Sequence, residues 1–206
     1  MKKMSLVLCL VISIVVVTGF YSEKMHSDIK GSLIRLHIIA NSDSKEDQDL
    51  KYRIRDKLIQ NYSEIPADGL EQAQQNLVDQ LPSIEQMVNA WLEEEQVPYR
   101  AKAVMGKDYF PTKQYGNLKL PAGEYEAVKV ILGEGKGQNW WCVMFPPICF
   151  VDGTTGFIDD DSEAYLKENL SEEEFKLITD DSAPVEIRFK IVELWQKWTN
   201  KKDVKK

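Results

Sequence analysis

The stretch from residue 121 to residue 152 constrains the fold of this chain more than any other. It holds two apolar runs with the composition of β-strands, Ala127–Leu132 and Trp140–Phe145. Three glycines lie between the runs, and glycine adopts the positive φ angles of a tight turn at little cost. The stretch ends with adjacent tryptophans, two consecutive prolines and two of the three cysteines. We therefore expect a central antiparallel hairpin, around which the rest of the chain is arranged.

The first 22 residues have the pattern of an export signal. Lys2 and Lys3 precede the uncharged segment 4–21, and a basic start followed by an apolar run is typical of a secretory signal. The uncharged segment also reaches the lower end of the roughly 17–25 residues that span a bilayer. We therefore expect residues 1–22 to export the chain, either as a cleaved signal peptide or as a signal anchor. Residues 23–30 are polar and are interpreted as a spacer.

The charge of the chain limits its partners. It has 26 basic and 33 acidic residues, a formal net charge of −7. An acidic domain repels nucleic acid and anionic lipid headgroups, so we expect no nucleic acid partner and membrane contact only through the leader. His26 and His37 are the two histidines, too few to favour a histidine-based metal site or catalytic dyad. We expect no metal and no cofactor.

Apolar stripes at helical spacing predict three helices before the glycine-rich stretch. The first covers residues 44–62, with Ser44 as its N-terminal cap. A break at 65–69 separates it from a second helix that Asp68 can cap. Pro82 suits the first turn of a third helix, which continues to about residue 95.

Two further segments alternate between apolar and polar side chains. Residues 33–39 and 99–105 therefore predict strands, the first with one buried face. Residues 108–119 are expected to form a loop with three exposed aromatic side chains. Helices before a small set of strands indicate an α+β fold. We expect a single domain in which these helices pack on a small, mainly antiparallel sheet.

We place the core domain at residues 31–152. Residues 153–206 form an acidic segment followed by a C-terminal amphipathic element. The acidic run at 159–174 is expected to be a solvated face or a mobile segment. Residues 185–191 fit either a helix or a strand, because their apolar side chains match both periodicities.

Cys142 and Cys149 enclose six residues in a domain that is expected to be exported, where a disulfide can form. Closing so short a loop would stabilise the fold by about 2.5 kcal/mol in the chain-entropy model. Two small buried thiols fit the sequence equally well. A thiol nucleophile would need a basic partner, and both histidines lie far upstream, so we do not expect a catalytic cysteine.

Other side chains of the central stretch suggest binding more than catalysis. Trp140 and Trp141 point to opposite faces of a strand, so one can be core while the other anchors an interface or stacks on a sugar. Both can equally be packed inside. Glu124 and Glu126 share one face, whereas the paired carboxylates of glycosidases lie on opposite sides of the scissile bond.

The glycine-rich turn at 133–137 precedes a strand and not the helix N-terminus that a phosphate site needs. The sequence also shows no set of nucleophile, base and oxyanion donors. These residues therefore indicate an exported binding domain and not an enzyme.

Several segments together resemble the stage II sporulation protein R family of endospore-forming bacteria. They are I-R-L-H-I-I-A-N-S-D-S at 34–44, F-P-T-K-Q-Y-G-N at 110–117, P-A-G-E-Y-E-A-V at 121–128 and G-K-G-Q-N-W-W-C-V-M-F-P-P-I-C-F at 135–150. The resemblance covers residues 34–152, and the last string is highly specific.

The resemblance implies a signalling protein. Family members are exported from the forespore into the space between the two membranes. There they trigger a membrane-embedded aspartic protease of the mother cell, which removes the pro-sequence of sigma-E. The family has no catalytic residues to carry over, so the motif residues are candidates for the partner surface: Tyr115, Glu124, Glu126, Asn139, Trp140 and Trp141. An exported cell-wall or glycan-binding module, or a wall hydrolase, is the alternative.

Overall fold

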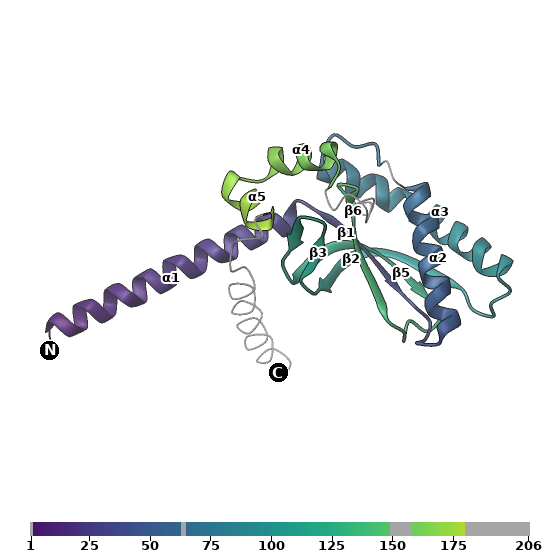
Figure 1. The fold of residues 1–206 in the computed structure, drawn as a ribbon, viewed down its shortest axis with the longest axis horizontal. Helices are drawn as coiled ribbons and strands as arrows, with labels where there is room; N and C mark the ends of the chain where they lie inside the picture. The colour runs from purple at the N-terminus through teal and green to yellow at the C-terminus, as the bar shows by residue number, and fades with distance from the viewer. Residues whose placement is uncertain (1, 63–64, 149–157, 180–206) are drawn as a thin grey trace.

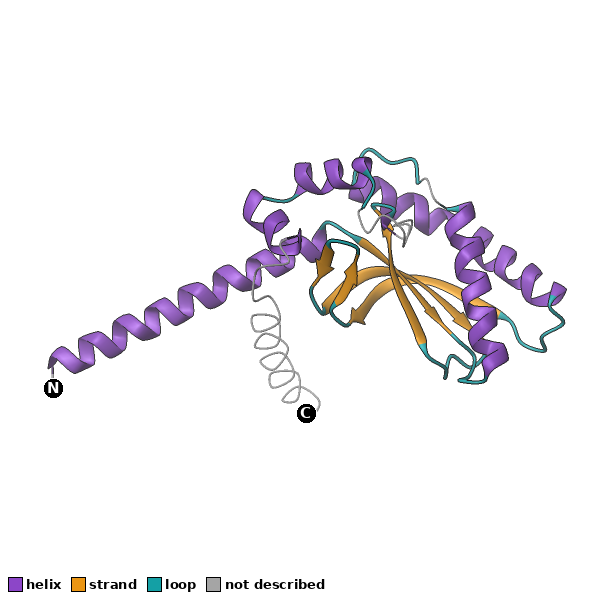
Figure 2. Ribbon diagram, viewed as in Figure 1, coloured by secondary structure: helices purple, strands orange, loops and turns teal. Residues whose placement is uncertain are grey.

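A computed structural model describes residues 2–62, 65–148 and 158–179 of the chain (Figure 1). Its centre is a four-stranded sheet in the order β2-β5-β1-β6 (Figure 2). The strands are β1 (Ile34–Ile39), β2 (Ala101–Phe110), β5 (Gly123–Leu132) and β6 (Asn139–Phe145). β1 runs parallel to β5 and antiparallel to β6, and β2 is antiparallel to β5. The predicted α+β class with a mainly antiparallel sheet is confirmed.

The predicted central hairpin is wrong, because β1 lies between β5 and β6 and pairs with both. Strands two positions apart in a sheet are separated by about 10 Å. The connection at 133–138 crosses that distance over the end of β1. Its Gly137 N–H donates to the carbonyl of Ala40 at 2.9 Å, and a Cβ on Gly137 would lie 2.2 Å from the Ser42 oxygen. The glycine therefore permits a close crossing.

One face of the sheet is covered by α2 (Lys45–Asn61) and α3 (Leu70–Glu94). Ser44 caps α2 as predicted, since its side chain accepts from the Asp47 N–H. The second and third predicted helices are a single helix, with Pro82 inside α3. Burial of the same apolar stripe on both sides of the proline favours a continuous helix over a break. Asp68 does not cap α3, which begins after Gly69 without a side-chain cap.

The segment predicted as a loop at 108–119 is mostly strand. β2 continues to Phe110, and β3 (Lys113–Tyr115) pairs with β4 (Leu118–Leu120). The reason is burial, because Phe110 and both leucines of β4 are fully buried in a second apolar cluster. Of the three aromatic side chains expected to be exposed, Tyr109 is exposed, Tyr115 is half-buried and Phe110 is buried.

The second face of the sheet is covered in part. The covering elements are the C-terminal end of α1 (Lys2–Gly31), β3 and β4, α4 (Asp160–Asn169) and α5 (Glu172–Thr179). The acidic run at 159–174 is therefore largely helical, and the two helices bury Leu166 and Ile178 beneath their acidic residues. Figure 1 shows α1 extending away from the sheet toward the N-terminus. Residues 185–191 lie outside the described residues.

α1 includes the leader and the segment interpreted as a spacer. Near its end, His26 and Ile29 are buried against the domain. No helix in the described part of the chain combines the length and the apolar character needed to cross a membrane.

Candidate functional site

The sheet face opposite α2 and α3, which we call the outer face, divides into two halves. The covered half surrounds Arg35 and lies beneath the end of α1, β3, β4, α4 and α5. The open half begins two residues further along β1, at His37, and none of the described elements covers it fully. We define the open half by the side chains that the strand register places on it: His37, Ile39, Val104, Asp108, Lys129, Ile131, Asn139 and Trp141.

Arg35 organises the covered half, and its side chain is fully buried. Its Nε donates to the Cys142 carbonyl at 2.8 Å, and its Nη2 donates to the Tyr115 hydroxyl at 2.8 Å. The guanidinium lies 4.4 Å from the Phe110 ring centroid and 4.8 Å from that of Tyr125, both cation–π distances. Arg35 and His37 were both expected on the solvent side of a half-buried strand, but both are buried. That expectation is wrong because later segments of the chain cover this face.

Tyr115 links the two halves. Its hydroxyl donates to the Trp141 carbonyl at 3.0 Å while it accepts from Arg35. Burial raises the pKa of Tyr115, although the Arg35 charge and hydrogen bond act against the rise. The hydroxyl therefore stays neutral and can donate. The β3–β4 hairpin is fixed to the sheet through this residue.

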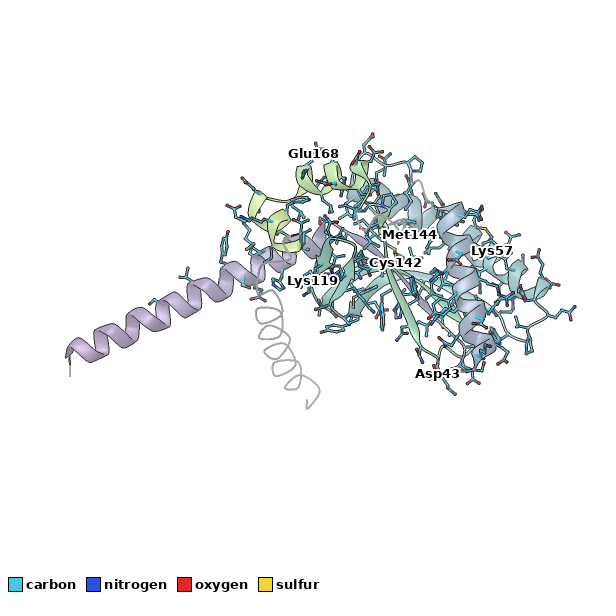
Figure 3. The ribbon with its side chains drawn as sticks, in the orientation of Figure 1. Asp43, Lys57, Lys119, Cys142, Met144 and Glu168 are labelled. Carbon is cyan, nitrogen blue, oxygen red and sulfur yellow. The ribbon has the colours of Figure 1, made fainter. Side chains whose placement is uncertain are left out.

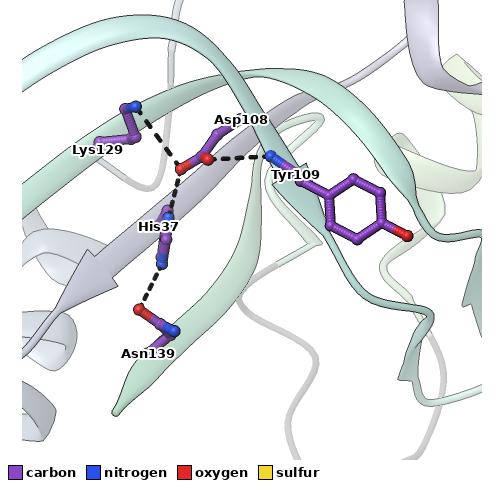
Figure 4. Close-up of polar contacts among 5 residues, drawn as sticks. All are labelled: His37, Asp108, Tyr109, Lys129 and Asn139. Atoms are coloured by element: carbon purple, nitrogen blue, oxygen red, sulfur yellow. Dashed lines mark hydrogen bonds and ion pairs between the residues drawn. The ribbon is translucent and has the colours of Figure 1, made fainter. Parts of the chain in front are cut away.

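His37 is the centre of the open half (Figure 4). Its Nδ1 lies 2.6 Å from Asp108 Oδ2, and its Nε2 lies 2.9 Å from Asn139 Oδ1. The Lys129 ammonium is 3.8 Å from the same Asp108 oxygen. The network joins side chains from all four strands of the sheet, because these residues come from β1, β2, β5 and β6.

Trp141 gives the open half its largest apolar surface. Its ring stacks on His37, with centroids 5.8 Å apart and planes at 19°. The Lys113 ammonium lies 4.7 Å from its ring centroid. Ile39, Val104 and Ile131 extend the surface as half-buried aliphatic side chains. A half-buried tryptophan beside aliphatic side chains is typical of a protein-binding surface.

The lysines make the open half unlike the rest of an acidic chain. Lys113, Lys129 and the exposed Lys102, which pairs with Ile131 in the β2–β5 register, surround the aliphatic side chains. Asp108 is the acidic side chain among them, and it contacts His37 and Lys129. This combination fits a partner surface that is apolar with acidic groups at its border.

The structure brings three of the six sequence-predicted residues together. Tyr115, Asn139 and Trp141 lie at the open half or directly support it. Trp140 points to the opposite face of β6, where it contacts Tyr52 and Arg55 of α2. The two tryptophans therefore lie on opposite faces as predicted, and each is half-buried.

Glu124 and Glu126 lie apart from this group. Both belong to the α2–α3 side of β5, near its start, where Glu124 is exposed opposite Tyr109. Sequence reasoning missed Asp108 and Lys129 because their contact depends on strand order. The signal for His37 was present, since it shares a strand face with Arg35 in the I-R-L-H-I-I motif.

The polar residues that follow β1, in the motif at 34–44, form a hydrogen-bonded network around Asp47. The Asp47 carboxylate accepts from Asn41 at 2.8 Å, from Ser42 at 2.5 Å and from Tyr99 at 2.5 Å. Burial alone would raise the pKa of Asp47, but these hydrogen bonds lower it overall. The carboxylate therefore has a structural role within the fold.

The glycine-rich connection is held by the same polar residues. The Glu134 N–H donates to Asn41 Oδ1 at 2.9 Å, and the Gln138 N–H donates to Asp43 Oδ1 at 2.7 Å (Asp43 is labelled in Figure 3). These donors are used within the chain, so the connection has a structural role, although as a crossing over β1 and not as the hairpin turn that was predicted.

Cys142 is buried on β6 and takes part in a disulfide. Cys149 lies outside the described residues, so its pairing with Cys142 stays a prediction. Within residues 2–62, 65–148 and 158–179, no group of three or more His, Cys, Asp or Glu side chains could hold a metal ion.

Comparison with known proteins identifies the family. The model of the family described as Stage II sporulation protein R matches residues 30–155. The chain belongs to this family. Stage II sporulation protein R of Bacillus subtilis (strain 168) is 39% identical over 171 residues, which cover 82% of this chain and 75% of that protein. No solved structure matches. The stage II sporulation protein R match includes the whole sheet and therefore both halves of the outer face.

Proposed function

We propose that this chain is an exported sporulation signal that activates a membrane-embedded aspartic protease of the mother cell, which then cleaves pro-sigma-E. The open half of the outer face is the surface that contacts the extracytoplasmic part of the protease. Membership of the stage II sporulation protein R family supports the signalling role. The choice of this surface rests on Trp141, which is half-buried on a sheet face that the described elements cover incompletely.

The chain would activate the protease by binding alone, without chemistry of its own. A ligand activates a protease only if it binds the active state more tightly than the resting state, and each tenfold preference contributes about 1.4 kcal/mol. The open half suits such a ligand because Trp141 and His37 are already held by Tyr115, Asp108 and Asn139. A preorganised surface loses little side-chain entropy on binding, so more of the contact energy stabilises the active protease.

The route to the protease is part of the proposal. The chain is made in the forespore and exported to the space between the two membranes, directed by residues 1–22. The leader is then either cleaved or retained as an anchor. α1 continues from these residues to Gly31 and contacts β5, so an uncleaved leader would hold the domain close to the membrane.

Reconstitution in a host that does not sporulate tests this function. The protease and pro-sigma-E are co-expressed with and without the full chain carrying its leader, and shortened sigma-E is measured by immunoblot. We expect cleavage only when the exported chain is present. Equal cleavage in both strains, or none in either despite an active protease, would contradict the signalling role. Binding to purified peptidoglycan would then favour the wall-binding alternative.

A further inference from the structure

β2 is an edge strand of the four-stranded sheet, since β5 is the one described strand that pairs with it. Ten residues of β2 pair with β5 in continuous antiparallel register, from Ala101 opposite Leu132 to Phe110 opposite Gly123. In such a ladder, alternate residues direct their backbone N–H and C=O groups toward the partner strand and away from it. The residues that face away can be identified from their other contacts.

α3 closes the first part of this edge. The Asn89 side chain donates to the Ala101 carbonyl at 3.0 Å and accepts from the Ala101 N–H at 2.8 Å. Glu85 accepts from the Ala103 N–H at 2.9 Å. Ala101 and Ala103 therefore face away from β5, and by alternation so do Met105, Lys107 and Tyr109.

The described helices do not close the second part of the edge in the same way. The Tyr109 N–H donates to Asp108 Oδ1 at 3.0 Å. Among the described residues, no hydrogen bond reaches the outward backbone groups of Met105 or Lys107, and the Lys107 side chain is exposed. An edge of this kind is a template for another strand unless it is protected.

Gly106 lies in the middle of the open edge. A Cβ at this position would meet no atom within 4 Å, and its φ is not in the left-handed region. Within the part of the chain that the structure describes, neither packing nor backbone geometry explains a glycine here. Glycine weakens a strand, and it often marks a place where another backbone approaches closely.

We propose that the edge of β2 from Met105 to Lys107 receives an extended segment of the activated protease as a fifth strand of the sheet. This inference rests on the proposed function and names how the partner binds. The incoming segment carries an acidic residue beside Lys107, an exposed cation of this edge whose side chain lies on the α2–α3 side of the sheet with Glu126. Val104 of the same strand lies on the other side, in the open half, so an added strand would also border the open half.

A second copy of this chain fits the edge poorly. A two-fold axis at Lys107 would place two lysines directly opposite each other, which is unfavourable. An axis at Gly106 would place Tyr109 of one copy against Ala103 of the other, where Glu85 already occupies the edge. A strand from a different protein avoids both conflicts.

Proline at position 107 tests the edge, because it removes the outward N–H and leaves the bonds to β5 in place. The full-length Lys107→Pro and Lys107→Ala variants are compared in the reconstituted host, with exported protein measured by immunoblot. We expect Lys107→Pro to reduce the rate of pro-sigma-E cleavage at least tenfold. We expect Lys107→Ala, which keeps the backbone donor, to retain more than a third of the wild-type rate. Wild-type cleavage in the same host separates a failure of this proposal from a failure of the signalling role.

Met105→Pro provides a second test at another outward position. The purified full-length variants are melted and followed by circular dichroism, so that loss of folding is distinguished from loss of binding. Folded Lys107→Pro or Met105→Pro protein that triggers cleavage at the wild-type rate would overturn the proposal. Equal losses in Lys107→Ala and Lys107→Pro would also overturn it, because the side chain and not the strand edge would then be the contact. If one proline variant does not fold, the cleavage rate of the other variant decides the result.

Discussion

Arg35 and His37 are two residues apart on the same strand and face, yet they lie in different environments. Arg35 is enclosed by Phe110, Tyr115 and Tyr125, and it donates to the Cys142 carbonyl and the Tyr115 hydroxyl. His37 is linked to Asp108 and through it to Lys129, whose side chains are each 25% exposed. The difference arises because distant segments cover one half of the face and stop before the other. The covered half is therefore expected to determine stability, and the open half to determine binding.

Arg35→Ala should give the largest effect. It leaves the buried Cys142 carbonyl and the Tyr115 hydroxyl without their donor and creates a cavity, so we expect the free energy of unfolding to fall by about 3 kcal/mol. His37→Gln should cost less, about 1 kcal/mol, since His37 is also buried but glutamine keeps a polar side chain beside Asp108 and Asn139. Urea denaturation of the full-length variants, followed by circular dichroism, measures both. Similar losses would contradict the division of the outer face.

His26, at the end of α1 that covers the sheet, should make stability depend on pH. Burial, and then the charge of Lys30, lower its pKa from 6.5 to about 4. Between these values the unfolded chain binds a proton that the folded chain does not, so stability falls as the pH drops from 6.5 to about 4. The total change is below about 3 kcal/mol. The free energy of unfolding, measured by urea denaturation at several pH values in this range, should depend less on pH in His26→Gln than in the wild type. An unchanged pH dependence would show that His26 is not its cause.

Trp141→Ala and Trp140→Ala compare the two faces of one strand. Loss of Trp141 removes the main apolar surface of the open half, so we expect at least a tenfold slower cleavage of pro-sigma-E, about 1.4 kcal/mol of binding. Trp140→Ala removes contacts with α2, so we expect the free energy of unfolding to fall by about 2 kcal/mol. The folded fraction of this variant should trigger cleavage at the wild-type rate. If both folded variants signal normally, the open half is not the contact surface.

Glu124→Gln should have the smallest effect. Glu124 is exposed on the α2–α3 side of β5, away from the open half. We expect its stability to change by less than about 0.5 kcal/mol and its cleavage rate to match the wild type. A wall hydrolase that used this carboxylate would instead lose its activity, so a zymogram on cell-wall polymers separates the two functions.

Local patterns predicted much of the fold. The alternation at 33–39, the capped stripe at 44–62 and the two apolar runs near 130 and 142 all depend on near neighbours, and each became the expected element. Strand order depends on contacts between distant segments, which is why the insertion of β1 between β5 and β6 was missed.

The candidate site was predicted only in part, because some of its contacts also join distant segments. Tyr115, Asn139 and Trp141 belong to a specific motif and could be named from the sequence. Asp108 and Lys129 reach His37 through the register of β2, β5 and β1, and no pattern within one segment encodes that register. The burial of Arg35 likewise depends on a hairpin about 80 residues downstream.

The position of β1 also determines when the domain can fold. Both neighbours of this strand are made about 90 to 110 residues after it, so β1 has no local partner with which to form a sheet. The loop closure that brings β5 and β6 to β1 must precede most of the apolar burial. If the chain is exported as proposed, the sheet therefore cannot be completed until β6 has also crossed the membrane.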